Sequence, residues 1–295
     1  MSQLVTLDNP LVASFYEALT FPVFRSKLYA TANEGAIVAV GANSHQKPIG
    51  LAMAEIFPDG RSSILSIFVD ASYRNQGIGT ALLENLLNQL KQRNCQSAQI
   101  VYVTGKPTII ALEKILAKNE WTTPKPRMLV CNCDRTQMLK VPWLQKEYPL
   151  PPEFEIFPWT EITEQQRVLL QNQQKNDKWI PVILNPFVHE YNLETLNSIG
   201  LRHNNEVVGW VINHRLCANT IRYTSSYMRP DLQKLGRILA LYAESIKRQI
   251  ANPEITKAVW TIPFVFPSMI AFAKKRMAEY LISMEESRES FKTMN

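Results

Sequence analysis

The sequence predicts an α/β (α+β) fold built from two consecutive domains, and three observations lead to this prediction. The chain has 295 residues, of which 46% are hydrophobic and 20% charged, so it is long enough to form two hydrophobic cores. Five prolines fall within residues 142–158 and predict an extended connector. The segments on either side of it follow the same order of strand, turn, strand, loop and helix. We therefore expect a first domain at residues 1–145 and a second at 146–295, each a mixed, mostly antiparallel sheet flanked by helices.

The first half alternates strands with helices. Residues 50–55 and 64–69 are expected to form a hairpin, with Asp59-Gly60 in its turn. Leucines at helical spacing predict a helix over 78–93. The remaining expected elements are a strand at 99–103, a helix at 107–119 and a strand at 128–133. Because few residues precede Gly50, we expect this half to lack or replace an opening strand.

The second half repeats this order. Gly50 aligns with Gly209, and the same sequence offset pairs Gly77 with Gly236 without a gap. This agreement predicts a tandem repeat, and chance similarity of two α/β segments is the alternative. The expected elements are strands near 154–156 and at 206–216, 221–228 and 258–262, and helices from 163, at 235–250 and at 267–280.

The most informative segment is the loop between the strand at 64–69 and the helix at 78–93. Gly77 and Gly79 keep this loop clear of side chains, and the helix N-terminus directs free amides and a positive dipole toward it. The arrangement predicts an anion site suited to a pyrophosphate. A glycine loop without a ligand is the alternative, whereas a dinucleotide fold fits less well because a third glycine is missing. In the second half Ile238 replaces the final glycine, so we expect that loop to be degenerate.

The run from Arg74 to Gly79 resembles the Arg/Gln-x-x-Gly-x-Gly/Ala signature of the GCN5-related N-acetyltransferase (GNAT) superfamily. The similarity covers residues 36–133 well and 154–290 more faintly, which implies two tandem acyl-CoA N-acyltransferase-like domains. It also implies that acetyl-CoA is the co-substrate, with its pyrophosphate in this loop and its pantetheine arm along the preceding strand. The cofactor-binding residues implied by the resemblance are Ile67, Phe68, Val69, Arg74, Asn75, Gln76, Gly77, Ile78, Gly79 and Thr80.

The resemblance implies a carboxylate on the fourth strand that acts as general base. It also implies a tyrosine on the fourth helix that acts as general acid. Leu65, Ser66 and Leu116 occupy the corresponding positions, so both usual catalytic groups are absent. Glu55, on the preceding strand, is the candidate substitute for the base, and Tyr102, at the end of the next strand, for the acid. The alternatives are a solvent-facing charge at Glu55 and a tyrosine packed against the sheet at Tyr102.

These features predict an N-acetyltransferase that moves an acetyl group from acetyl-CoA to a primary amine of a small molecule or peptide. A non-catalytic acyl-CoA sensor is the alternative, because the usual catalytic groups are missing, and a scaffold protein is a third. The sequence names no acceptor, because no residue pattern is specific for one amine.

Composition limits the partners and the compartment. The net charge of +6 is spread over both halves, without the basic, aromatic-rich run typical of nucleic-acid binding. No apolar run is long enough for a membrane span, and the N-terminal residues do not resemble a secretory signal. Four cysteines are too few for a disulfide framework, and Cys131 and Cys133 are interpreted as buried thiols and not as metal ligands. We expect a cytoplasmic monomer or homodimer without a metal.

Overall fold

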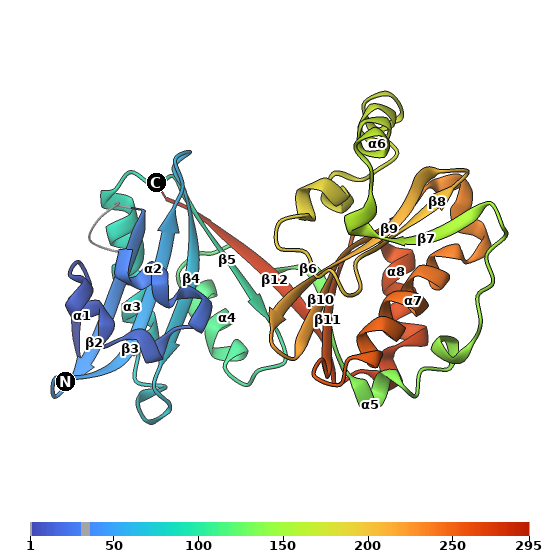
Figure 1. The fold of residues 1–295 in the computed structure, drawn as a ribbon. Helices are drawn as coiled ribbons and strands as arrows, with labels where there is room; N and C mark the ends of the chain where they lie inside the picture. The colour runs from blue at the N-terminus through green and yellow to red at the C-terminus, as the bar shows by residue number, and fades with distance from the viewer. Residues whose placement is uncertain (1, 31–35, 295) are drawn as a thin grey trace. The chain divides into compact units, whose positions relative to one another are not determined.

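The computed structural model describes residues 2–30 and 36–294, and the chain divides into two compact units (Figure 1). Unit 1 comprises Met1–Arg127 and Glu286–Asn295, and unit 2 comprises Met128–Glu285. Unit 1 is therefore assembled from both ends of the chain. The ranges 1–145 and 146–295 remain our proposal for where the two repeats meet along the sequence.

Unit 1 is a mixed sheet with helices on both faces. Its strands follow the order β1-β2-β3-β4-β5-β12, and each neighbouring pair is antiparallel except the parallel pair of β4 and β5. Helices α3 and α4 contribute to the core on one face, and α1 and α2 to the core on the other (Figure 1). The strands are β1 (Gln3–Thr6), β2 (Ile37–Ser44), β3 (Lys47–Ile56), β4 (Arg61–Val69), β5 (Ser97–Val103) and β12 (Ser283–Thr293), and the helices are α1 (Pro10–Ser14), α2 (Arg25–Tyr29), α3 (Ile78–Gln92) and α4 (Ile109–Lys118).

Alternation along β3 sets these two faces. Leu51 and Met53 pack with the α1–α2 core, and Ala52 and Ala54 pack with the α3–α4 core. The expectation that this half lacks or replaces an opening strand is wrong, because β1 and β2 precede β3 and pair antiparallel. The expected helix at 78–93 is confirmed by α3, whose leucines are buried.

The C-terminal strand β12 belongs to the sheet of unit 1. Ser287–Thr293 pair antiparallel with Ser97–Val103 of β5 (Figure 1). Ser290 Oγ donates a hydrogen bond to the Thr122 carbonyl at 2.6 Å. Sequence patterning misses β12, because its inward positions include the buried serines Ser287 and Ser290 and not an alternating series of apolar residues.

Unit 2 follows the same plan as unit 1. Its strand order is β6-β11-β10-β9-β8-β7, with a parallel pair of β10 and β11 and antiparallel pairs elsewhere. The strands are β6 (Lys125–Asp134), β7 (Phe154–Pro158), β8 (Ile199–His203), β9 (Glu206–Cys217), β10 (Thr220–Met228) and β11 (Lys257–Pro263), and the helices are α5 (Arg135–Met138), α6 (Glu164–Asp177), α7 (Arg237–Ala251) and α8 (Pro267–Arg276).

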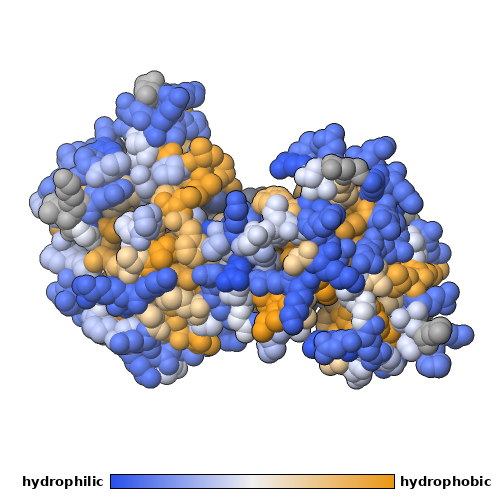
Figure 2. Space-filling model, turned by 180° about the vertical axis from the view of Figure 1, so that it is seen from behind, coloured by the Kyte–Doolittle hydropathy of each residue, from blue (hydrophilic) through white to orange (hydrophobic). Residues whose placement is uncertain are grey.

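Aromatic rings fill one face of this second sheet. Trp159 and Trp210 are fully buried there, together with Leu170 of α6. Helices α7 and α8 pack on the opposite face. Figure 2 shows unit 2 on the left, with apolar surface gathered below the hydrophilic helix α6. Within residues 2–30 and 36–294, no helix is long and apolar enough to cross a membrane.

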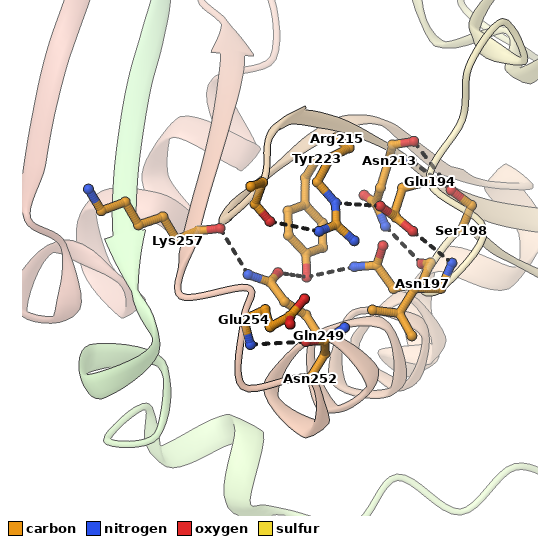
Figure 3. A network of polar contacts seen from close by, with 12 residues as sticks. Glu194, Asn197, Ser198, Asn213, Arg215, Tyr223, Gln249, Asn252, Glu254 and Lys257 are labelled. Carbon is orange, nitrogen blue, oxygen red and sulfur yellow. Dashed lines mark hydrogen bonds and ion pairs between the residues drawn. The ribbon is translucent and has the colours of Figure 1, made fainter.

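A network of polar side chains lies between α7 and the neighbouring strands of unit 2 (Figure 3). Asn213 Nδ2 donates to Ser245 Oγ at 3.0 Å and to the Asn197 carbonyl at 2.8 Å. Tyr223 donates to Gln249 Oε1 at 2.9 Å. Asn197, Asn213, Ser245 and Gln249 are fully buried, so these bonds replace apolar packing at the centre of the unit.

Candidate functional site

The loop after β4 is held in place by short-range hydrogen bonds. The Asp70 N–H donates to the Ile49 carbonyl at 2.8 Å, and the Asp70 side chain accepts from the Ser72 N–H at 3.0 Å. Arg74 turns back, and its Nε donates to the Val69 carbonyl at 3.0 Å. The loop is therefore anchored to β3 and to its own strand before the chain enters α3.

Two residues in the left-handed conformation then direct the chain into the helix. They are Asn75, with φ of 61°, and Gly77, with φ of 79°, which is the N-cap of α3. No side chain in the described part of the chain caps this helix, and a Cβ at Gly77 would meet no described heavy atom within 4 Å. The first amides of α3, at Ile78, Gly79 and Thr80, thus lie beside open space.

This geometry fits an anionic group. A helix N-terminus without a cap offers unpaired N–H groups and the positive end of the dipole, which together bind phosphate. Gly79 allows close approach, and a Cβ at this position would already lie 3.2 Å from Ile115 Cδ1. The structure thus brings the predicted residues of the loop together around one helix terminus.

Strand β4 separates from β5 before it reaches this loop. The two strands pair only between Arg61–Ile64 and Ser97–Ile100, although β4 continues to Val69. The register with β3 shifts between Ile64 and Ser66, so a bulge lies at Leu65. Beyond it, the predicted residues Ile67–Val69 have no partner on β5, and their backbone is available to an extended ligand.

Tyr102 lies on the part of β5 that has separated from β4. Its hydroxyl donates to Glu113 Oε1 of α4 at 2.7 Å, and Arg288 of β12 donates to the same oxygen at 3.0 Å. Burial, followed by the Glu113 hydrogen bond, raises the pKa of Tyr102 well above its ordinary value. The hydroxyl is therefore a weaker acid than an ordinary tyrosine, and its proton is directed at the Glu113 carboxylate.

Glu55 lies on the other face of the sheet. It continues the alternation of Leu51 and Met53 toward the α1–α2 face, and Lys27 Nζ of α2 lies 2.5 Å from Glu55 Oε1. Glu55 pairs in register with Ser63, just before the bulge in β4. The structure therefore does not bring Glu55 and Tyr102 together on one face, and the Glu55 carboxylate already has a cationic partner.

Sequence reasoning missed Glu113 and Arg288. Glu113 is a charge on a helix whose other face is apolar, a pattern that also describes an ordinary exposed residue. Arg288 lies far from Tyr102 along the chain and reaches it only because β12 pairs with β5. The sequence contains no local signal that links these residues.

The loop of unit 2 shares a left-handed glycine at the helix start but differs in its other residues. Gly236 has φ of 68° and is the N-cap of α7, as Gly77 is for α3. Ile238 stands at the position of Gly79, and its side chain packs against the core of unit 2. The expected elements of the anion site are thus incomplete in unit 2.

Comparison with known proteins agrees with this geometry. Residues 4–116 match the model of the acetyltransferase (GNAT) family. The ribosomal protein bS18-alanine N-acetyltransferase of Escherichia coli (strain K12) is 28% identical over 123 residues, which are 41% of this chain and 82% of that enzyme. Residues 4–116 therefore form a GNAT-family domain. The family model and this relative make the chain an acyltransferase of the kind that uses an acyl-CoA as donor.

Solved structures extend the fold comparison to nearly the full length of this chain. A tandem GNAT protein from the clavulanic acid biosynthesis pathway has a TM-score of 0.68 at 11% identity, covering 99% of this chain and 98% of that one. A GCN5-related N-acetyltransferase from Sphaerobacter thermophilus has a TM-score of 0.57 at 12% identity, covering 99% and 95%. The predicted fold class, two tandem GNAT-like domains, is confirmed.

The cysteines and acidic residues form no metal-binding cluster in the described ranges, 2–30 and 36–294. Cys131 and Cys133 are buried, and burial raises the pKa of their thiols to about 12 and about 11. Thiols of this kind are protonated at neutral pH and are poor ligands.

Proposed function

We propose that unit 1 transfers an acetyl group from acetyl-CoA to a primary amine of a small-molecule or peptide acceptor. The observation that carries this proposal is the uncapped N-terminus of α3 beside the separated strands β4 and β5. The amides at residues 78–80 would hold the pyrophosphate, and the free backbone of Ile67–Val69 would bind the pantetheine arm. Bound there, acetyl-CoA supplies the activated thioester.

Tyr102 is our candidate for the acid that protonates the departing thiolate. Glu113, itself held by Arg288, fixes the orientation of the hydroxyl, and proton transfer to the thiolate requires that the hydroxyl leave its hydrogen bond to Glu113. Glu55 stays our candidate for the base. It lies on the strand next to the bulge, and release of the amine proton through it requires that Lys27 give up its ion pair.

We further propose that the two units are copies of one domain and that only unit 1 has kept the use of acyl-CoA. Helices α3 and α7 have the same length, and the sequence offset that relates them is the one that relates Gly77 to Gly236. The four free cysteines support the cytoplasmic location that we expect.

Binding and turnover with acetyl-CoA test the proposal directly. We expect one molecule bound per chain by calorimetry. Release of free thiol in the presence of an amine panel is expected as well, the panel comprising polyamines, aminoglycosides, amino acids and peptides with an N-terminal alanine. Binding without turnover on every amine would favour the sensor instead, and absence of binding would overturn both functions.

A matched pair of glycine variants locates the site. Gly77→Ala and Gly236→Ala place a Cβ in the same left-handed conformation, so each costs about 1–2 kcal/mol of stability. We expect only Gly77→Ala to weaken acetyl-CoA binding, by about tenfold or roughly 1.4 kcal/mol. Gly79→Val should weaken it further. Equal losses for the two alanine variants would contradict the assignment to unit 1.

A further inference from the structure

Unit 2 contains a cavity of about 530 Å³ that the proposed function does not use. Its walls come from β10, β11, α7 and α8, with further residues from 138–144, before β7, and from 181–184, after α6. Strands β10 and β11 pair only between Thr220–Tyr223 and Lys257–Trp260, and the cavity begins where they separate. It therefore occupies in unit 2 the place between diverging strands that we assign to the pantetheine arm in unit 1.

The cavity walls are aromatic and apolar. Among the residues that line it are the half-buried rings of Trp143, Trp260, Tyr227, Tyr242, Phe266 and Phe272. Aromatic side chains of this size usually lose most of their exposed area when a domain folds. Their remaining exposure inside a concave site means that their faces are available to a ligand.

No charged side chain lines the cavity, since Asp, Glu, Lys, Arg and His are missing from its described walls. Its polar groups are largely committed to the protein. Ser226 Oγ and the Tyr242 hydroxyl are 2.6 Å apart, and Gln233 Nε2 donates to the Met228 carbonyl at 2.8 Å. A ligand with a net charge would lose its hydration here and find no counter-charge.

The phosphate end of a CoA molecule is excluded for a separate reason. Ile238, at the first turn of α7, lines the cavity where unit 1 has Gly79. A β-branched residue thus replaces the glycine that, in our assignment for unit 1, lets a pyrophosphate approach the helix backbone. Unit 2 has therefore kept the slot between the strands and lost the anion site.

We propose that unit 2 binds an uncharged, apolar small molecule in the cavity between β10 and β11, in place of an acyl-CoA. The volume lies within the range of about 300–1,000 Å³ that is common for small-molecule sites. Stacking on rings and contact with methionine sulfur supply the attraction, which needs few hydrogen bonds.

A neutral dye tests whether the site exists. We expect Nile red to bind the full chain at one site per molecule with enhanced fluorescence. Competition then tests the chemistry of the ligand. Decanol should displace the dye at least about ten times more effectively than decanoate or decylammonium, because the two ions would lose their hydration in a cavity without a counter-charge. Equal competition by all three would overturn the claim of an uncharged ligand.

Filling the cavity tests its location. Thr261→Phe and Ala273→Phe each add a ring at a lining position on a different element, so one variant suffices if the other does not fold. We expect either to weaken dye binding by at least tenfold. Val259→Phe is the matched control, because Val259 is on the same strand but is not a lining residue, and its affinity should stay unchanged. Equal affinity in both filled variants and the control overturns the proposal.

Acetyl-CoA separates this inference from the proposed function. Binding at one site per chain that is unaffected by Thr261→Phe supports a phosphate-free ligand in unit 2. A second acetyl-CoA site that Thr261→Phe abolishes would overturn it. Loss of all acetyl-CoA binding while the dye still binds would refute the function of unit 1 and leave the inference for unit 2 standing.

Discussion

The two units share one arrangement of strands and helices, but unit 1 has apolar side chains at its centre and unit 2 has polar ones. In unit 1 the cross-strand pair Ala54–Ile64 lies under Leu86 and Leu90 of α3, and all four side chains are apolar and buried. At the positions related by the sequence offset between Gly77 and Gly236, unit 2 has the pair Asn213–Tyr223 under Ser245 and Gln249 of α7. These polar residues form the network in Figure 3.

The difference shows that the fold accepts either an apolar or a hydrogen-bonded centre when all four central residues are of the same kind. Hydrogen bonds fix α7 against its sheet in one geometry, whereas the apolar packing of α3 is less directional. The network is not complete, because Asn197 Oδ1 and Asn213 Oδ1 find no hydrogen-bond partner among the described residues. We infer that unit 2 gives up some stability at its centre relative to unit 1.

Removal of residues 286–295 should have the largest effect on this comparison. The deletion removes the β12 residues that pair with β5, together with Arg288, so we expect unit 1 to lose stable structure although unit 2 keeps its β8–β9 ladder. Hydrogen exchange measures both at once. Amides of β5 should exchange nearly as in the unfolded chain, and full protection of β5 after the deletion would show that unit 1 is complete without its C-terminal strand.

Substitution of single residues at the two centres should have the next largest effect, on the free energy of unfolding. Leu86→Ser removes a fully buried side chain and adds an unpaired hydroxyl, so we expect a loss of about 3–5 kcal/mol in the free energy of unfolding. Ser245→Leu should cost about 1–3 kcal/mol, because it leaves Asn213 Nδ2 without one acceptor. Urea denaturation measures both losses.

A combined variant tests the two centres more closely. Asn213→Ala, Tyr223→Ile, Ser245→Leu and Gln249→Leu together give unit 2 the centre of unit 1, and we expect it to recover at least half of the loss caused by Ser245→Leu alone. A combined loss equal to the sum of four separate losses would mean that the two centres are not interchangeable.

The pH dependence of stability should show the smallest effect. Burial raises the pKa of Tyr102 in unit 1 and of Tyr223 in unit 2 above the ordinary value of 10.0. A raised pKa means that the folded state binds this proton more tightly, so its contribution is complete below pH 10 and declines as pH rises further. Urea titrations from about pH 9 to about pH 11 should give a shallower decline for Tyr102→Phe, by less than about 1.4 kcal/mol per pH unit.

The tyrosine in the other unit provides the control for this measurement. Tyr223→Phe should also flatten the decline, but it removes a hydrogen bond to Gln249 and lowers stability at neutral pH. An identical decline in the wild-type chain and in Tyr102→Phe would show that the Tyr102 hydroxyl is not held in its protonated form.

Sequence patterning performed well where the structure depends on near neighbours. Leucine spacing predicted α3, glycines marked both positive-φ helix starts, and the run Arg74–Gly79 indicated the GNAT family whose model matches residues 4–116. It failed for β12, whose buried positions are serines, and for Arg288, whose partner Glu113 is 175 residues away. No periodicity can report a contact of that kind.

Residue order alone specifies the local parts of this protein, which are the two strand–loop–helix segments, the open loop at Gly77 and Gly79, and the replacement of its second glycine by Ile238 in unit 2. These depend on backbone conformation and on side-chain size within one turn. The folded chain was needed to show which strands complete unit 1, how Glu113 and Arg288 hold Tyr102, and that unit 2 keeps an apolar cavity. Such features arise from pairing and packing between distant segments, which residue order does not encode in a local pattern.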